Sequence, residues 1–237
     1  MAVKNKFTVP DCEQCKSYND SLFHFCHTHE SATINENKTS AIYKKGQVIF
    51  HEGANSYGLY CLNSGKVKLF KMAPDGKEQI LKIVAPGDFL GYGALLAATP
   101  YRVTAEVMED AIICFIPKDL ITQLFKENAR FSEGMVKMLT KTLDDTVEKM
   151  THIAYKPVRG RIAEALLILK ETYKTADNPD GVINITREDL ASYVGTVKET
   201  AIRVLKDLKE EGLVTTDNHA IKIVNAQGLT RVCELYD

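Results

Sequence analysis

The stretch that decides the fold is "ITREDLASYVGTVKETAIRVLKDLKEEGLV", residues 185–214. Thr186 is followed three residues later by Asp189, and Thr196 is followed at the same spacing by Glu199. A hydroxyl residue with an acid three positions on is typical of a helix start, because each side chain can bond a backbone N–H that the helix leaves unpaired. The stretch therefore predicts two helix starts close together.

Two glycines indicate where these helices end. Gly195 lies between the two starts, and Gly212 follows the second apolar run. Glycine readily adopts the left-handed conformation that ends many helices. The predicted helices therefore occupy residues 187–194 and 197–211. The apolar positions that would hold them at a steep angle are Leu190, Ala191, Val194, Val204 and Leu205.

This arrangement predicts a helix-turn-helix, whose second helix enters the major groove of DNA. After it, "LVTTDNHAIKIVN" predicts a strand, a turn at Asp217 and Asn218, and a second strand, which together form a wing. The residues expected to contact DNA are Arg187, Thr196, Lys198, Glu199, Thr200, Ile202, Arg203 and Lys206.

Single side chains of the second helix have more than one interpretation. Glu199 can serve only as the acid of a helix cap, or it can accept a hydrogen bond from cytosine N4. Arg203 lies four residues further on and can donate to guanine or brace Glu199. Lys206 suits a phosphate contact or a solvated surface charge better than a base contact.

Composition bounds the protein class without identifying a partner. The chain has 237 residues, of which 45% are hydrophobic and 26% are charged, and its formal net charge is -1. The overall charge gives no support to nucleic-acid binding, so that prediction must rest on local arrangement. No apolar run approaches the ~18 residues that span a bilayer, and no apolar signal segment follows Met1, so a cytoplasmic location is expected. In a reducing cytoplasm, cysteines are thiols or metal ligands more often than disulfides.

Glycine usage predicts a β domain ahead of the helices. Eight of the fourteen glycines lie between Gly46 and Gly93, between short runs such as "GLYCLN", "KVKLFKM" and "EQILKIV". Short strands separated by glycine turns indicate an antiparallel sandwich or barrel. "VTAEV" (103–107) and "AIICFIP" (111–117) continue the series as two further strands, and Pro117 ends it.

The sequence then changes to a long helix. Apolar or small residues recur at spacings of 3, 4, 3, 4 and 3, the seam of a coiled coil, at Val136, Leu139, Leu143, Thr146, Met150 and Ile153. The helix either joins two copies of the chain or packs on its own β domain. The predicted fold class is α+β: a Cys/His-rich segment (1–29), an antiparallel β jelly roll (30–127), a dimerisation helix (128–155) and a winged helix-turn-helix (156–237).

Four stretches resemble the CRP/FNR family of bacterial transcription regulators: "YKKGQVIFHEG", "GLYCLNSGKVKLFK", "PGDFLGYGALL" and the helix-turn-helix itself. The resemblance implies a homodimer that binds an inverted-repeat operator in double-stranded DNA, with RNA polymerase as a protein partner. It places an acidic base reader at Glu199 and an arginine at Arg203. Ile202 stands where the best-known members have a small residue or Ser, so part of their half-site should be disfavoured.

The resemblance also implies a cyclic-nucleotide-binding shape for the β domain, with an effector pocket at Gly91, Tyr92, Arg102, Val103 and Thr104. Nucleotide-binding members present a Glu where this chain has Tyr92, and an Arg-Ser/Thr pair where it has Val103 and Thr104. Arg102 lies one residue off, where strand alternation would direct it away from the ligand. We therefore do not expect cAMP to bind, and another effector or none remains open.

The N-terminal stretch "CEQCKSYNDSLFHFCHTH" (12–29) has three interpretations. In the oxygen-sensing branch of the resembled family, three such cysteines and one from a late strand hold a [4Fe–4S] cluster, which implies Cys12, Cys15, Cys26 and Cys114 here. The ten residues between Cys15 and Cys26 exceed the gap of that branch. Zinc held by the first three with His29 is the second interpretation. Buried core thiols beside a loose chain end are the third, and Cys61 and Cys233 are read as structural.

The absence of a P-loop or of a nucleophile paired with a base favours a protein that acts by binding and is not an enzyme. A rival class is a metal- or redox-active sensor in which the cysteines carry the primary function and the helix pair is structural. A cyclic-nucleotide-gated regulatory subunit is disfavoured, because the phosphate-binding arginine is missing.

Overall fold

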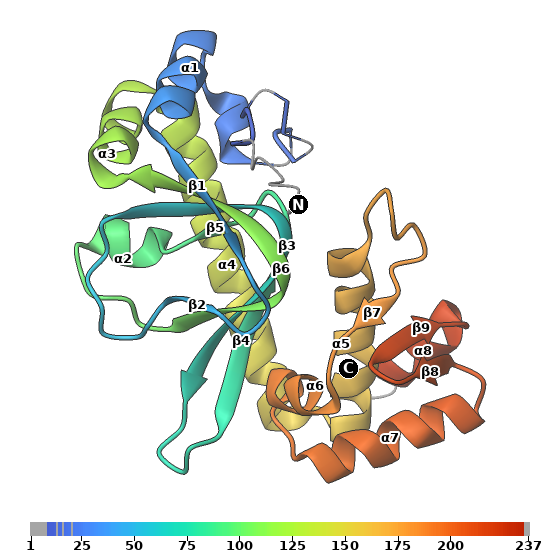
Figure 1. Cartoon of the computed structure of the whole chain (residues 1–237). Helices are drawn as coiled ribbons and strands as arrows, with labels where there is room; N and C mark the ends of the chain where they lie inside the picture. The colour runs from blue at the N-terminus through green and yellow to red at the C-terminus, as the bar shows by residue number, and fades with distance from the viewer. Residues whose placement is uncertain (1–8, 13, 16, 20, 235–237) are drawn as a thin grey trace, which may run out of the picture. The chain divides into compact units, whose positions relative to one another are not determined.

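The computed structural model describes residues 9–12, 14–15, 17–19 and 21–234 (Figure 1). The chain forms two compact units. The first consists of residues up to 69 together with 84–140, and the second of residues 70–83 together with 141–237. Helix α4 (Ala129–Tyr155) begins in the first unit and continues into the second.

A six-stranded sheet has most of its strands in the first unit, while nearly all of β4 belongs to residues 70–83 of the second (Figure 1). Its strands are β1 (Thr39–Tyr43), β2 (Val48–Phe50), β3 (Gly58–Met72), β4 (Glu78–Val84), β5 (Phe89–Leu90) and β6 (Thr104–Pro117). The order is β1-β6-β3-β4, with β2 also on β6 and β5 also on β3. Both β1 and β2 run antiparallel to β6, which confirms the predicted antiparallel β domain.

Two long strands replace four predicted short ones. β3 runs through Gly65, and β6 joins the runs predicted as separate strands at 103–107 and 111–117. The prediction of separate strands was wrong because Gly65 does not mark a chain reversal. Its φ is +90°, and a Cβ added there would meet Asp110 O at 2.6 Å and Ala111 Cα at 2.7 Å. Gly65 thus permits a close backbone approach inside the sheet.

Helices precede the first strand. They are η1 (Leu22–Phe25), a 3-10 helix, and α1 (Thr28–Asn37). The predicted β domain began at residue 30, but strand β1 begins only at Thr39. The helical start is favoured locally because the Glu30 carboxylate accepts a 2.7 Å hydrogen bond from the backbone N–H of His27.

Aromatic packing fixes this N-terminal segment on the first unit. Phe23 is buried, with its ring edge-on to Phe89 at 4.9 Å and stacked on Phe131 of α4 at 6.4 Å between centroids. Asn128 lies between α3 (Lys118–Glu127) and α4, and its side chain donates to Phe25 O and to Glu30 Oε2. The stretch "SLFHF" (21–25) therefore docks on the first unit through its aromatic rings.

The second unit contains the predicted winged helix-turn-helix. Its elements after α4 are α5 (Val158–Tyr173), β7 (Ile183–Asn184), α6 (Arg187–Val194), α7 (Lys198–Glu210), β8 (Val214–Asp217), β9 (Ala220–Ile223) and α8 (Ala226–Glu234). The wing is a three-stranded sheet in the order β7-β9-β8, one strand more than predicted. Both short helices match their predicted bounds to within one residue.

The turn between α6 and α7 corrects one predicted cap. Gly195 is left-handed, with φ +70°, and Thr186 caps α6 by accepting from Asp189 N, as expected. Helix α7, however, has Val197 at its N-cap, without a side-chain hydrogen bond. The backbone N–H of Thr196 instead donates to Ala191 O at 3.0 Å, so this residue closes α6 and does not open α7.

Among the described residues, no helix is both long enough and apolar enough to cross a membrane.

We predict that Phe23→Ala lowers the thermal unfolding midpoint of the protein, because the change removes a fully packed ring from the first unit. The expected cost is about 3–5 kcal/mol. Phe125→Ala, at a ring that is 37% exposed, is the matched control and should cost less than about 1 kcal/mol. Equal midpoints for the two variants, measured by circular dichroism, would show that Phe23 does not anchor the segment.

Candidate nucleic-acid interface and cysteine cavity

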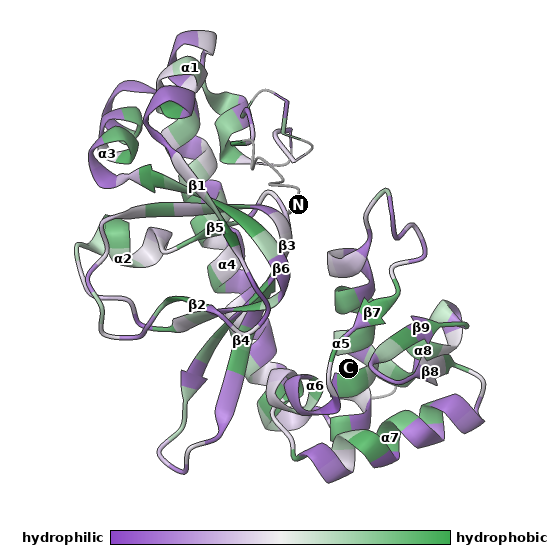
Figure 2. Cartoon of the chain, in the orientation of Figure 1, coloured by the Kyte–Doolittle hydropathy of each residue, from purple (hydrophilic) through white to green (hydrophobic). Residues whose placement is uncertain are grey.

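Helix α7 has one apolar face and one polar face, visible as alternating hydrophobic and hydrophilic bands (Figure 2). Its buried residues are Ala201, Val204, Leu205 and Leu208. The opposite face is exposed and carries five of the predicted DNA contacts: Lys198, Glu199, Ile202, Arg203 and Lys206. The side chains predicted to contact DNA are thus brought together on one solvent-facing surface, which we call the α7 face.

The charged side chains of the α7 face differ in whether they form an ion pair. Lys198 pairs with Glu188 at 3.6 Å, and Lys206 with Glu210 at 3.7 Å. Exposed pairs of this kind contribute little free energy, so both ammonium groups can exchange their partners for phosphate. Glu199 takes no part in a hydrogen bond or ion pair of its side chain within the described residues.

Two apolar residues also belong to the α7 face. Ile202 is 46% exposed and Val197 is 50% exposed. Exposed aliphatic groups at the start of a recognition helix can contact the methyl group of thymine. The predicted DNA contacts did not include Val197, which the structure places at the N-cap of α7.

Arg187, a predicted DNA contact, makes a hydrogen bond to the wing that the sequence did not predict. Its Nη2 donates to the carbonyl of Asn218 at the turn of the wing, at 2.9 Å. Partial burial lowers the pKa of this guanidinium below its usual value. Arg187 therefore braces the wing, while Thr196 and Thr200 are partly buried beside the turn.

The end of α7 is held by an ion pair to α5. Arg159 Nη2 lies 2.7 Å from Oε1 and 2.6 Å from Oε2 of Glu211. One guanidinium nitrogen donating to both carboxylate oxygens fixes the helix end more tightly than a single contact would.

The predicted dimer seam on α4 divides into a buried and an exposed part. Leu139 is partly buried against the core of the first unit. Val136, Leu143, Met150 and Ile153 are exposed, as is Thr146, whose hydroxyl bonds to the carbonyl of Thr142. Val147, which the seam omitted, is 55% exposed. We call Val136, Leu143, Val147, Met150 and Ile153 the α4 stripe.

The five predicted effector residues do not share one environment. Gly91 is left-handed, and a Cβ there would lie 3.0 Å from the ring of Tyr101. Tyr92 packs against the core that contains Cys61 and Cys114, whereas Val103 packs against the other core of the first unit. The hydroxyl of Thr104, at the start of β6, accepts from Glu52 N. Gly91, Tyr92 and Thr104 lie at the starts of elements, and Val103 directly precedes β6.

Arg102 needs a correction. It lies in the bend before β6 and not on a strand, so alternation does not set its direction, and its side chain is exposed. Its neighbour Tyr101 is buried and stacks on Phe50, with 3.9 Å between ring centroids. Burial raises the pKa of Tyr60, which also contacts Phe50, to about 12, with smaller contributions from Tyr101 and Tyr43.

Four cysteines line one cavity of the first unit. They are Cys12, Cys15, Cys61 and Cys114, and we call this the cysteine cavity. Three of the four were predicted as ligands. The fourth, Cys61, was read as structural, and the predicted Cys26 does not line the cavity. Sequence spacing could not find Cys61, because β3 brings it beside the others only in the folded sheet.

Three of these sulfurs accept hydrogen bonds. Lys38 Nζ donates to Cys12 at 2.9 Å, Asn63 Nδ2 to Cys15 at 3.1 Å, and Ser40 Oγ to Cys114 at 3.2 Å. The ammonium of Lys38 also bonds the carbonyl of Pro10 and the side chain of Asn35. Donors directed at sulfur are the outer contacts that tune metal-bound thiolates.

Burial governs the cysteine pKa values. It raises the pKa of Cys12, against an opposing effect of the Lys38 ammonium. Burial raises the pKa of Cys61 well above the usual value, and the neighbouring Cys114, Cys15 and Cys12 add smaller effects. The pKa of Cys26 rises to about 12, through burial and then through the nearby Glu30 carboxylate.

The predicted zinc set is not assembled. Tetrahedral zinc with Zn–S bonds of about 2.3 Å holds its sulfurs about 3.8 Å apart. Within the part of the chain that the structure describes, the metal-binding side chains that gather within 4.8 Å of one another are Glu148, His152 and Glu164. Cys12, Cys15, Cys26 and His29 therefore do not form a site for a single ion.

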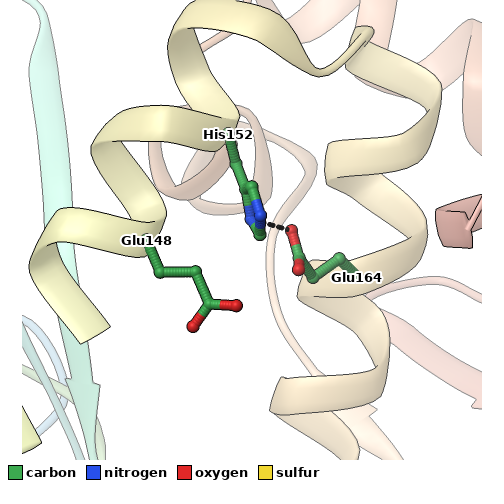
Figure 3. Close-up of side chains that lie close together, drawn as sticks. All are labelled: Glu148, His152 and Glu164. Atoms are coloured by element: carbon green, nitrogen blue, oxygen red, sulfur yellow. Dashed lines mark ion pairs between the residues drawn. The ribbon is translucent and has the colours of Figure 1, made fainter. Parts of the chain in front are cut away.

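Glu148, His152 and Glu164 lie where α4 and α5 face one another in the second unit (Figure 3). His152 Nδ1 is 2.8 Å from Glu164, whose other oxygen is 3.6 Å from Lys156. Glu148 is exposed and has no ion pair to the other two (Figure 3). The Lys156 ammonium offsets the Glu164 charge, which makes this a contact between helices and a poor cation site.

Two family models match the chain. The model described as "Cyclic nucleotide-binding domain" matches residues 41–128, and the model described as "Crp-like helix-turn-helix domain" matches residues 160–232. Together they cover more than half of the 237 residues. The chain belongs to the CRP/FNR family of transcription regulators.

CRP/FNR relatives of several kinds are similar to it. A cAMP-activated global transcriptional regulator CRP of Pasteurella multocida is 28% identical over 84% of this chain and 90% of its own length. The "Anaerobic regulatory protein" of Bacillus subtilis is 26% identical over 81% of this chain and 82% of its own. A solved CRP-family regulator from Thermus thermophilus is 26% identical, with a TM-score of 0.70 over 82% of this chain and 96% of that chain.

Proposed function

We propose that this CRP/FNR regulator acts as a homodimer that reads an inverted-repeat operator through α7 and responds to a signal at its cysteine cavity. It acts in the cytoplasm by binding, without covalent chemistry, and RNA polymerase is its protein partner. The observation that carries the proposal is the α7 face, where charged and apolar side chains suited to contact bases and phosphates project together from a helix whose other face is buried.

The α7 face assigns a role to each projecting side chain. Glu199 accepts from cytosine and Arg203 donates to guanine, which together specify one G·C pair in each half-site. Lys198 and Lys206 bind phosphate after leaving their carboxylate partners. Ile202 and Val197 supply apolar contacts. Arg187 acts indirectly, by holding the wing.

The α4 stripe supports the dimer. Leu143 is 62% exposed and Met150 is 67% exposed, and the stripe continues over several turns of one helix. Contiguous exposed apolar surface on a soluble protein is typical of an interface. A two-fold copy of the same helix is self-complementary to such a stripe.

We predict that Leu143→Glu gives monomers that lose specific DNA binding, because it places a charge in the apolar α4 stripe. Light scattering at micromolar concentration measures the mass. Lys141→Glu, about 160° around the helix from Leu143, is the control and should remain dimeric. A monomeric wild type, or a dimeric Leu143→Glu variant, would contradict the role of the stripe.

We predict that Glu199→Ala relaxes base preference at one position of each half-site, at a cost of roughly 1–3 kcal/mol. Lys206→Ala should weaken all sequences alike and lower the salt dependence of binding, because it removes a phosphate contact. The operator comes from genomic footprinting and should be an inverted repeat with half-sites about 34 Å apart. Unchanged base preference in Glu199→Ala would leave Glu199 without a role in recognition.

For the signal, we propose a [4Fe–4S] cluster in preference to cAMP. The cavity offers four thiols, the ligand number of such a cluster, and the sulfurs are spread more widely than one zinc ion allows. When bound, the cluster supplies a redox-active centre. Cys12, Cys15 and Cys114 hold it, while Asn63 and Ser40 donate to two of the sulfurs. Nucleotide-binding members of the family have a Glu for the ribose where this chain has Tyr92. Arg102, which lies one residue from the position of their phosphate-binding arginine, is outside the strand.

We predict that protein purified without oxygen contains iron and acid-labile sulfide and little zinc, and bleaches in air. Cys114→Ser should abolish the colour, because it removes a ligand on the sheet. Cys233→Ser is the control, since that thiol donates to the carbonyl of Leu229 in its own helix. Genomic footprinting with and without oxygen tests whether the cluster controls binding. A colourless, metal-free wild type with intact operator binding would rule out the cluster.

A further inference from the structure

We propose that Cys61 is the fourth thiolate ligand of the cysteine cavity and that Cys26 is not a ligand. This rests on the proposed cluster and changes its ligand set from the one that the family resemblance implies. Two ligands would then come from the sheet and two from the N-terminal segment.

The placement of the side chains is the first argument. Cys61 is on β3 and Cys114 on β6, which are neighbours in the sheet. Cys12 and Cys15 complete the lining of the same cavity from the chain segment that precedes η1. Cys26 follows η1 as its C-cap, with its backbone N–H bound to Phe23 O, and does not line the cavity.

The hydrogen bonds of the sulfurs are the second argument. A cysteine packed as a core thiol donates its S–H to a carbonyl, as Cys233 does to Leu229. Around the cavity the direction of the hydrogen bonds is the opposite, since the sulfurs are acceptors. Lys38, Asn63 and Ser40 donate to Cys12, Cys15 and Cys114, respectively. Cys61 lines the same cavity as these three sulfurs. Three of the four cavity sulfurs thus accept hydrogen bonds, the kind of contact that metal-bound thiolates receive.

Buried charge is the third argument. Lys38 is only 7% exposed, and its hydrogen-bond partners among the described residues are a backbone carbonyl, an amide oxygen and the Cys12 sulfur. A buried ammonium with neutral partners is unfavourable unless an anion lies nearby. Four thiolates around a cluster provide that anion. Cys26 does not line the cavity and so is not placed to supply that charge beside Lys38.

The experiment compares Cys61→Ser with Cys26→Ser in the full-length chain, purified without oxygen. Iron, acid-labile sulfide and visible absorbance are measured per chain. Cys26→Ser should keep the wild-type content. Cys61→Ser should lose the cluster, with iron, acid-labile sulfide and visible absorbance all at background, because it removes a thiolate ligand.

Since Cys61 is buried, its variant needs a test of folding. Circular dichroism compares the folding of the metal-free Cys61→Ser and wild-type proteins. The mass of the dimer, measured without operator DNA, is a second readout. Should Cys61→Ser fail to fold, Cys26→Ser still decides, because the proposal requires full iron content in that variant, whose partly buried side chain lies outside the cavity.

The outcomes separate the two levels of the proposal. Loss of iron in Cys26→Ser, with retention in Cys61→Ser, overturns the ligand assignment and leaves the cluster in place. Loss in both variants also overturns it, because Cys26 would then be required. A wild type without iron and sulfide overturns the cluster and, with it, the ligand assignment.

Discussion

The exposed apolar surface of α4 is the constraint on which the proposed assembly depends. The same helix buries Phe131, Gly134 and Met135 in the first unit and then leaves Leu143 and Met150 in solvent. A helix that only packed on its own β domain would place polar residues along the rest of its length. Covering the stripe with a second copy removes it from water and, by the same symmetry, supplies the second recognition helix that an inverted repeat requires.

The helix-turn-helix could be predicted from sequence because its signals are local. Thr186 and Gly195 act within a few residues of their own positions, and both α6 and α7 follow the predicted bounds closely. The Thr196 cap failed for an equally local reason that sequence does not reveal. Thr196 lies where the signals for the end of α6 and the start of α7 overlap. Its backbone N–H bonds to the end of α6.

What the sequence could not predict depends on contacts across the sheet. The continuity of β3 through Gly65 depends on Ala111, far away in the chain, where the backbones approach too closely for a side chain. The cysteine cavity has the same origin. Spacing groups Cys12, Cys15 and Cys26 because they are near in sequence, whereas the sheet and the N-terminal segment select Cys61 in place of Cys26.

Lys38 connects the cavity to the position of the N-terminal segment. Its ammonium bonds the carbonyl of Pro10 and the sulfur of Cys12 from a position directly before β1, so it holds the segment against the sheet. Thiolate charge strengthens both the contact with Cys12 and the burial of Lys38, because each ion offsets the desolvation of the other. Loss of that charge leaves the ammonium buried with neutral partners, which weakens the same contacts that dock the segment. Under the proposed cluster, a change at the cysteines would therefore alter how firmly the segment packs on the first unit.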